Sequence, residues 1–269
     1  MKPVLFYVFG FPIRSWSVLL LTGFLVAWWL ASRRAQKFGI TKDQLGSLSL
    51  TMLLSGIVGA RVFWVAQEWK SYEHNWLQAL NFSEGGMTSF GGLFFGIAAL
   101  LIWCRIAKLS SLAALDLIAA PALVAIAIGR VGCLLNGCCY GSECSLPWAI
   151  MIRDEHGHTY LGHPAQLYDS AMNLIGAALL FKYESIVDSA NKYRAGTYIS
   201  WALIISGLSR FVYEIFRIGS SSAPVKKGFP ITDAQIVALL MAIAGAIVLW
   251  RSSIRSSTNP QELKNRNAH

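Results

Sequence analysis

The chain has 269 residues, of which 55% are hydrophobic and only 14% are charged. A soluble domain carries about 25% charged residues, so this chain lacks the polar surface to cover itself in water and is expected in a membrane, in keeping with its mean hydropathy of +0.48. The formal net charge of +9 is expected to set the orientation in the membrane and not to bind nucleic acid.

Seven apolar segments are expected to span the membrane as helices, since each is close to the roughly 20 residues that a bilayer core requires. In chain order they cover residues 15–31, 48–66, 90–106, 112–128, 167–181, 196–212 and 231–250. The predicted fold class is an all-α polytopic membrane protein, with one transmembrane domain over residues 1–269.

The basic residues predict the orientation of these segments. Thirteen of them fall on one side of the membrane if the segments alternate in direction, and positive loops face the cytoplasm. The N-terminus is therefore predicted outside and the C-terminus in the cytoplasm. The thirteen residues are Arg33, Arg34, Lys37, Lys42, Arg105, Lys108, Lys182, Lys192, Arg194, Arg251, Arg255, Lys264 and Arg266.

Two outer segments are long enough to form structure outside the bilayer. Residues 67–86 contain Trp69 and Trp76 and are expected to form an outer amphipathic arm lying on the membrane surface. Residues 141–165 are polar and are expected to form a small periplasmic cap. The residues from Arg251 onward are expected to be a polar tail.

Four charged residues lie within membrane segments or at their ends, where a charge is costly unless it has a partner or a function. Arg130, Arg210 and Arg217 lie at outer-facing helix ends. They either snorkel to lipid phosphates or recognise an anionic head group through their planar donors, and we favour recognition. Asp116 lies inside the fourth segment, so it is either functional or paired, for example with a helix N-terminus.

The stretch "GRVGCLLNGCCYG" (129–141) combines glycines, thiols and an arginine. Its glycines predict a bend out of the membrane beside Arg130, which suits a phosphate. Its three cysteines, with Cys144, leave open a disulfide, a catalytic thiol or small buried apolar residues. The spacing C-x4-C-C-x4-C is not a standard ligand pattern, so neither a metal site nor a cofactor is predicted.

At this stretch the chain resembles the phosphatidylglycerol–prolipoprotein diacylglyceryl transferases. The family's pattern G-R-x-G-x-x-x-N-G-x-x-x-G is intact here, and six further blocks follow the family's order along nearly the whole chain. These blocks are "GFLVAWWLASRRA", "GARVFWV", "GGMTSFGGLFFG", "HPAQLYD", "GLSRFVYEIFR" and "ITDAQIVALLMAIAG". The resemblance implies seven membrane helices and transfer of diacylglyceryl from phosphatidylglycerol to the lipobox cysteine of a prolipoprotein.

The resemblance also implies the site. The catalytic residues it implies are Arg210, Glu214 and His163. The substrate-binding residues it implies are Arg130, Asn136, Gly137, Gly141, Gln166, Tyr168 and Arg217. The implied partners are phosphatidylglycerol, prolipoprotein signal peptides and membrane lipids. The implied location is the bacterial inner membrane, with the site facing the periplasm or outer leaflet.

At five positions, this chain carries a different residue from the one that is typical of the family. Phe90 stands in place of a histidine and Trp16 in place of a tyrosine. Cys133 and Cys138 replace an asparagine and a glutamate, and Ser206 replaces another tyrosine.

These differences leave the identity of the catalytic base open. A thiol must lose its proton before it attacks, and the side chain of Phe90 cannot accept a proton as the family's histidine could. Glu214 or His163 could serve, or the charge of the arginines could lower the pKa of the substrate thiol enough. Glu214 could instead pair with Arg210 or Arg217, and His163 could merely cap a helix. Two other functions stay open: a paralogue on the same scaffold that binds or transfers a glycerophospholipid moiety to another acceptor, and a membrane thiol–disulfide oxidoreductase.

Overall fold

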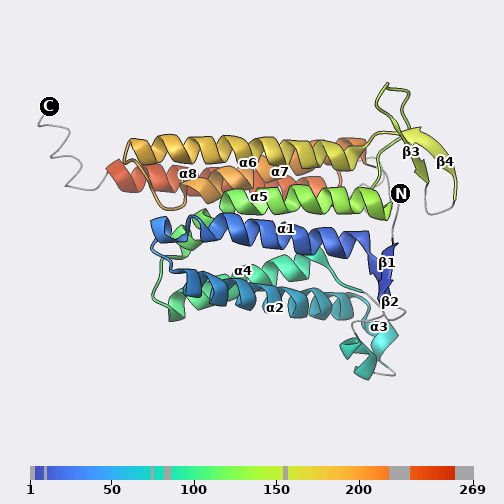
Figure 1. Cartoon of the computed structure of the whole chain (residues 1–269), viewed down its shortest axis with the longest axis horizontal. Coiled ribbons are helices and arrows are strands. Elements are labelled where there is room, and N and C mark those ends of the chain that lie inside the picture. The colour runs from blue at the N-terminus through green and yellow to red at the C-terminus, as the bar shows by residue number, and fades with distance from the viewer. Residues whose placement is uncertain are drawn as a thin grey trace, which may run out of the picture. The chain divides into compact units, whose positions relative to one another are not determined.

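The computed structural model describes residues 4–8, 11–73, 76–81, 86–153, 157–217 and 231–257, and this part of the chain is mostly helical. Its seven long helices (Figure 1) are α1 Ser15–Ser32, α2 Lys42–Gln67, α4 Ser89–Ile106, α5 Ser111–Asn136, α6 Ala165–Ser189, α7 Thr197–Phe216 and α8 Asp233–Ser257. Three short helical segments accompany them: η1 Ala35–Phe38, α3 Trp69–Tyr72 and η2 Trp76–Leu80.

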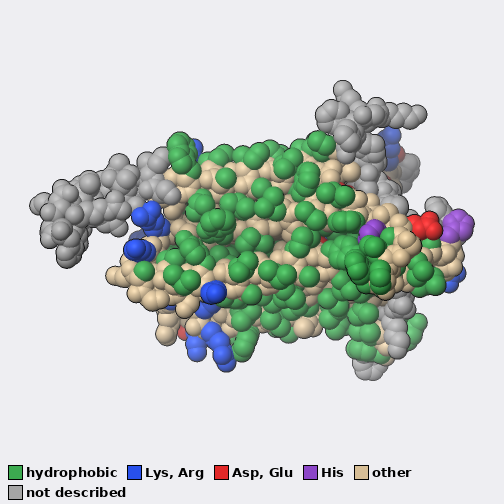
Figure 2. Space-filling view, turned by 90° about the horizontal axis from the view of Figure 1, so that it is seen from above, with side chains coloured by type: hydrophobic (Ala, Val, Ile, Leu, Met, Phe, Trp, Pro, Cys, Tyr) green, Lys and Arg blue, Asp and Glu red, His purple; other side chains and the backbone are tan. Residues whose placement is uncertain are grey.

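Several of these helices are built to lie in lipid. Five of the described helices, α1, α2, α5, α7 and α8, contain an 18-residue window apolar enough to cross a membrane, and α4 contributes a further apolar stretch, Phe90–Ile106. Hydrophobic side chains spread over the helices in Figure 2. On α6, for example, Ile175 and Leu179 are each 60% exposed. Exposed apolar faces of this size mark a membrane protein.

The prediction of a mostly helical polytopic membrane protein is confirmed, but the chain is not all-α, because the described residues include four short strands. β1 Val4–Val8 pairs antiparallel with β2 Phe11–Arg14, and β3 Ile150–Arg153 pairs antiparallel with β4 Thr159–Gly162. Each hairpin has strands of only four or five residues, which are too short to be predicted from hydrophobic periodicity. The β3–β4 hairpin falls in the segment expected to form the outer cap, of which residues 154–156 lie outside the description.

Several predicted helix boundaries were too narrow. α2 begins at Lys42 and not at Leu48, because Thr41 and Gln44 form a capping box ahead of the apolar run. α5 continues to Asn136 and α7 to Phe216, so that Arg130 and Glu214, which lay beyond the predicted segment ends, lie within helices. α8 continues to Ser257, where a polar tail was expected from Arg251; residues 258–269 lie outside the description.

The chain divides into two compact units. The second unit, residues 32–114, contains α2 packed against α4. In it, the guanidinium of Arg61 is buried and donates hydrogen bonds to the carbonyl oxygens of Gln78, Ala79, Asn81 and Gly86. These bonds hold the described part of the 67–86 segment onto α2.

The first unit, residues 1–31 and 115–269, contains α1, both hairpins, most of α5, and α6 to α8. Asp116 of α5 is fully buried there and accepts hydrogen bonds from the backbone amides of Gly196 (2.6 Å) and Ile199 (2.7 Å) and from the hydroxyl of Tyr193 (3.0 Å). The carboxylate therefore caps the N-terminus of α7. The predicted pairing of Asp116 with a helix N-terminus is confirmed, and α5 and α7 are fastened together by it.

Candidate functional site

The turn that follows α5 brings the signature residues back toward that helix. Gly137 has φ +74°, and its amide donates to the carbonyl of Leu134, so the helix ends in a left-handed C-terminal turn. The amide of Cys138 then donates to the carbonyl of Cys133 (3.1 Å). The predicted bend is therefore at Gly137, whereas Gly129 and Gly132 lie inside α5.

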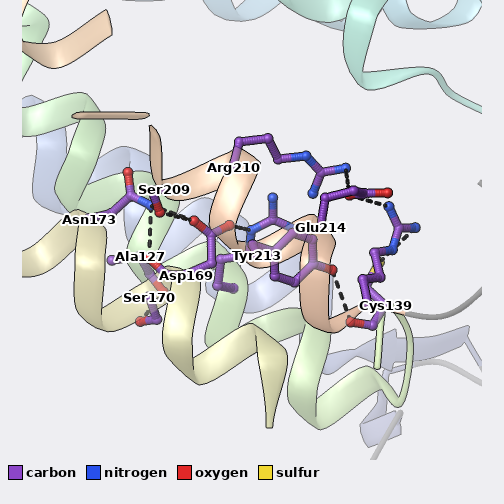
Figure 3. Close-up of polar contacts among 11 residues, drawn as sticks. Ala127, Cys139, Asp169, Ser170, Asn173, Ser209, Arg210, Tyr213 and Glu214 are labelled. Atoms are coloured by element: carbon purple, nitrogen blue, oxygen red, sulfur yellow. Dashed lines mark hydrogen bonds and ion pairs between the residues drawn. The ribbon is translucent and has the colours of Figure 1, made fainter. Parts of the chain in front are cut away.

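Arg130 is held by a carboxylate that was not among the predicted site residues. Its Nε lies 2.5 Å from Oδ2 of Asp169 on α6, and Asp169 is only 2% exposed. The same carboxylate accepts hydrogen bonds from the hydroxyl of Ser209 on α7 and from the amide of Asn173 (2.8 Å) (Figure 3). Three helices thus fix the orientation of one guanidinium.

Tyr213, on α7, stands at the centre of the site and was also not among the predicted site residues. The guanidinium carbons of Arg130 and Arg210 each lie 4.8 Å from its ring centroid, and that of Arg217 lies 5.9 Å away. These are cation–π distances. Its hydroxyl donates to the carbonyl of Cys139 (2.9 Å), as Figure 3 shows. One tyrosine thereby links three cations to the turn after α5.

Glu214 pairs with two of these cations. Its Oε2 lies 3.2 Å from Arg210 and 3.6 Å from Arg217, and its side chain is fully buried. We call Arg130, Arg210 and Arg217, with Tyr213, Asp169 and Glu214, the arginine cluster. Three guanidinium groups face two carboxylates, so one positive charge is in excess. The side chains of the three arginines stay partly exposed, by 26% for Arg210, so an anion can reach the cluster.

Gln166 supports the turn from α6. It is fully buried, and its Nε2 donates to the carbonyl of Cys138 (2.8 Å). Within the described part of the chain, its Oε1 has no hydrogen-bond partner. A buried acceptor without a donor costs free energy unless a ligand supplies that donor, so this oxygen is a candidate for contact with substrate.

His163 and Tyr168 form an aromatic group with Phe216. His163 Nδ1 lies 3.2 Å from the Tyr168 hydroxyl, to which Trp148 also donates (2.8 Å), and the ring centroids of His163 and Phe216 are 5.0 Å apart. His163 does not cap α6 through its side chain, because Pro164 is the N-cap residue and makes no such bond. Among described residues, no hydrogen bond or ion pair joins His163 to the arginine cluster.

Gly141 joins the turn to α7 and to the cap segment. It pairs with Arg217 in a β-bridge, and the Tyr160 hydroxyl donates to its carbonyl (3.1 Å). A Cβ at Gly141 would overlap the carbonyl oxygen of His163 and lie 2.7 Å from the His163 Cβ. Only glycine therefore permits this approach. Asn136 is the last residue of α5, directly before the turn at Gly137.

Three cysteines meet beside the arginine cluster. The sulfur atoms of Cys133, Cys138 and Cys139, which we call the thiol cluster, lie within 4.8 Å of one another. All five cysteines of the chain are free thiols. Arg217 Nη2 lies 4.0 Å from Cys139 Sγ. Hydrogen bonds from the other two thiols, and the charges of Arg217 and Arg130, lower the pKa of Cys139.

The residues that replace family residues lie in different places. Phe90 is 60% exposed on α4 of the second unit, and Trp16 is 37% exposed on α1. Cys133 and Cys138 belong to the thiol cluster. The residues predicted to be catalytic or substrate-binding all belong to the first unit.

Comparison with known proteins gives the family. A family model described as prolipoprotein diacylglyceryl transferase matches residues 3–251. Curated relatives carry the name phosphatidylglycerol–prolipoprotein diacylglyceryl transferase. That of Clostridioides difficile (strain 630) is 29% identical over 264 residues, covering 97% of this chain and 100% of the relative. That of Synechococcus sp. (strain CC9902) is 30% identical over 260 residues, covering 92% of each. The chain belongs to the prolipoprotein diacylglyceryl transferase family.

Proposed function

We propose that this chain transfers a diacylglyceryl group from phosphatidylglycerol to the thiol of a prolipoprotein's lipobox cysteine. The observation that carries the proposal is the arginine cluster, whose excess positive charge is partly exposed. In the reaction the acceptor sulfur attacks a glyceryl carbon, and the carbon–oxygen bond to phosphate breaks. Cations fixed beside that phosphate stabilise the charge that develops on the leaving oxygen.

The residues then have separate tasks. Arg130, Arg210 and Arg217 bind the phosphate, and Glu214 holds two of them in place. The free Oε1 of Gln166 accepts a hydrogen bond from a glycerol hydroxyl of the head group. Asn136, Gly137 and Gly141 shape the wall of the site. His163, oriented by Tyr168, is the proposed proton acceptor, and Glu214 is the alternative against which it is tested.

The proposed setting in the membrane follows the basic residues. Seven spans put the N-terminus outside and the C-terminus in the cytoplasm, so that the arginine cluster opens to the periplasm or outer leaflet of the inner membrane. Residues 1–269 then form one transmembrane domain, residues 67–86 lie as an arm on the outer surface, and residues 141–165 form a periplasmic cap. Prolipoprotein signal peptides and membrane lipids are the partners in this arrangement.

The test is a direct assay of transfer. Purified protein is mixed with phosphatidylglycerol vesicles and a lipobox peptide, and the peptide cysteine is examined by mass spectrometry for a diacylglyceryl adduct. Arg210→Ala should lower kcat/KM about a hundredfold, as loss of one fixed donor to a developing oxyanion does. Arg153→Ala, which removes an exposed arginine of β3, is the matched control and should transfer at the wild-type rate.

One competing function remains tied to an observation, the replacement of the family histidine by Phe90. A paralogue with another acceptor would bind phosphatidylglycerol through the arginine cluster but leave the lipobox peptide unmodified. Arg210-dependent phosphatidylglycerol binding by folded protein, without an adduct, would therefore favour the paralogue over the transferase.

A further inference from the structure

The thiol cluster has the composition of a catalytic metal site. We propose that Cys133, Cys138 and Cys139 bind a zinc ion, and that the fourth position on this ion takes the acceptor thiol of the transfer reaction. This inference rests on the proposed function, which supplies the thiol acceptor.

The three sulfur atoms are close to the spacing that zinc requires. They lie within 4.8 Å of one another, and in a tetrahedral site with zinc–sulfur bonds of about 2.3 Å the sulfurs are about 3.8 Å apart. Cys133 is fixed in α5 and is 9% exposed. Cys138 and Cys139 lie in the turn beyond Gly137, so small shifts of their side chains close the remaining distance.

The number of ligands indicates a catalytic site. Structural zinc sites have four protein ligands, whereas catalytic sites have three and leave one position open. Cys144 lies outside the thiol cluster: its amide donates to the carbonyl of Leu161, and it lines a separate pocket with Glu143 and Ser145. Cys138 and Cys139 are partly exposed, so a fourth ligand can approach the cluster.

The surroundings suit the charge of such a centre. A zinc ion with three thiolates carries one net negative charge, which is costly in a membrane protein unless cations lie beside it. Arg217 lies 4.0 Å from Cys139 Sγ, and its guanidinium belongs to the arginine cluster. Arg217 therefore offsets part of the negative charge of the loaded site.

The ligands are also oriented by neighbours, as the ligands of metal sites usually are. The carbonyl of Cys138 accepts from Gln166, and the carbonyl of Cys139 accepts from Tyr213. Tyr213 thus connects the proposed metal centre to the phosphate-binding arginines, which places the nucleophile and the leaving group next to each other.

The chemistry answers the question raised by Phe90. A thiol attacks only as the thiolate, and a thiol bound to a zinc ion is deprotonated outright. The acceptor thiol binds zinc and gives its proton to the proton acceptor of the site, His163 or Glu214, and its sulfur forms a bond to the glyceryl carbon. The electron pair of the breaking carbon–oxygen bond stays on the phosphate, which takes up one proton as glycerol phosphate leaves. The neutral thioether then dissociates, and zinc keeps its +2 charge throughout.

Metal content tests the site itself. Protein purified with zinc should contain one zinc ion per chain, and Cys138→Ser and Cys139→Ser should each lower its zinc affinity at least about tenfold. Cys144→Ser is the matched control and should bind zinc as the wild type does. The absorption spectrum of cobalt(II) bound in place of zinc tests the site without any substitution. Thiolate ligands should give it a strong charge-transfer band. Zinc binding unchanged in the cluster variants would overturn the proposal, as would a disulfide among the three cysteines in freshly purified, zinc-free protein.

The pH dependence of transfer tests the role of the ion. At pH 7 a free thiol with a pKa near 8.5 is only about 3% thiolate, so removing zinc with a chelator should slow transfer about thirtyfold, and zinc chloride should restore it. This difference in rate between the zinc-free and the zinc-loaded protein should shrink as the pH rises toward about 9, because more of the free thiol is then ionised. Equal rates with and without zinc, or a deficit independent of pH, would overturn thiol activation. Cysteine-dependent zinc binding with no transfer at any pH would instead overturn the proposed function.

Discussion

Arg130 Nε lies 2.5 Å from Asp169 Oδ2, and this contact joins the signature helix α5 to α6. Asp169 is almost fully buried and is itself held by Ser209 and Asn173. A guanidinium that is oriented before substrate arrives loses little side-chain entropy on binding a phosphate. The arginine cluster is therefore preorganised by carboxylates that need not touch the substrate.

Replacing Asp169 by asparagine should release Arg130 while keeping the shape of the side chain. Hydrogen bonds to charged groups contribute about 1.5 to 3 kcal/mol, so we expect kcat/KM for phosphatidylglycerol to fall about tenfold or more, mainly through a higher KM. Transfer kinetics with varied phosphatidylglycerol measure this. Asp188→Asn, at an exposed position of the same helix, is the control. Wild-type kinetics for folded Asp169→Asn would show that Arg130 does not depend on this contact.

Two signature glycines should respond in opposite ways to alanine. At Gly141 a methyl group would overlap the backbone of His163 and strain the bridge to Arg217, so Gly141→Ala should abolish most transfer and lower the thermal stability. At Gly129 a methyl group meets nothing within 4 Å, and alanine in a helix is favoured over glycine by about 0.5 to 1 kcal/mol. Gly129→Ala should therefore keep wild-type transfer and raise the thermal stability slightly. Thermal unfolding in detergent and the transfer assay distinguish the two variants. Equal tolerance at both positions would contradict the close approach at Gly141.

The cap of α7 should make stability depend on alkaline pH. Burial, together with the charge of Asp116, raises the pKa of Tyr193. Above the ordinary tyrosine pKa of about 10, the unfolded chain loses the Tyr193 proton while the folded chain keeps it. Stability should therefore be unaffected by this group below about pH 9 and fall by up to about 1.4 kcal/mol per pH unit above pH 10.

Tyr193→Phe should remove this alkaline loss, and Asp116→Asn should cost about 2 to 3 kcal/mol at neutral pH through the lost cap. Unfolding in detergent across pH 7 to about 11 measures both. If the wild type and Tyr193→Phe lose stability in parallel above pH 10, the assignment of Tyr193 is incorrect.

Glu214 should act by holding arginines. Because its carboxylate is buried between Arg210 and Arg217, Glu214→Gln should lower kcat/KM about tenfold and leave the shape of the pH–rate profile unchanged. Glu143→Gln, at an exposed position, is the control. Loss of one limb of the profile in Glu214→Gln would identify Glu214 as the proton acceptor, whereas the same change in His163→Gln would assign that task to His163.

Much of the helical framework could be predicted from hydrophobic runs, because a lipid-facing helix needs an uninterrupted apolar segment. The ends could not, since polar first turns and glycine-containing last turns carry no such signal. α5 shows the reason: Gly129 and Gly132 are tolerated inside the helix, and only the left-handed conformation at Gly137 ends it. Asp116 was predictable because an intramembrane carboxylate must find donors.

The site was predictable where charge was conspicuous and not where a neutral or common residue organises it. Arg130, Arg210 and Arg217 stand out at membrane depth, but Tyr213 and Asp169 look ordinary in "GLSRFVYEIFR" and "HPAQLYD". A second acidic residue within a membrane segment, Asp169, was the signal available for the missing partner of Arg130. The thiol cluster could not be predicted from spacing, because the turn at Gly137 returns Cys138 and Cys139 toward Cys133.

The most direct test of this account is transfer to a lipobox peptide by the wild type and by Arg210→Ala, with Arg153→Ala as control. We predict a diacylglyceryl adduct on the peptide cysteine with the wild type and the control, and about a hundredfold slower transfer with Arg210→Ala. An adduct formed at the wild-type rate by folded Arg210→Ala, or no adduct from folded wild-type protein, would contradict the central claim.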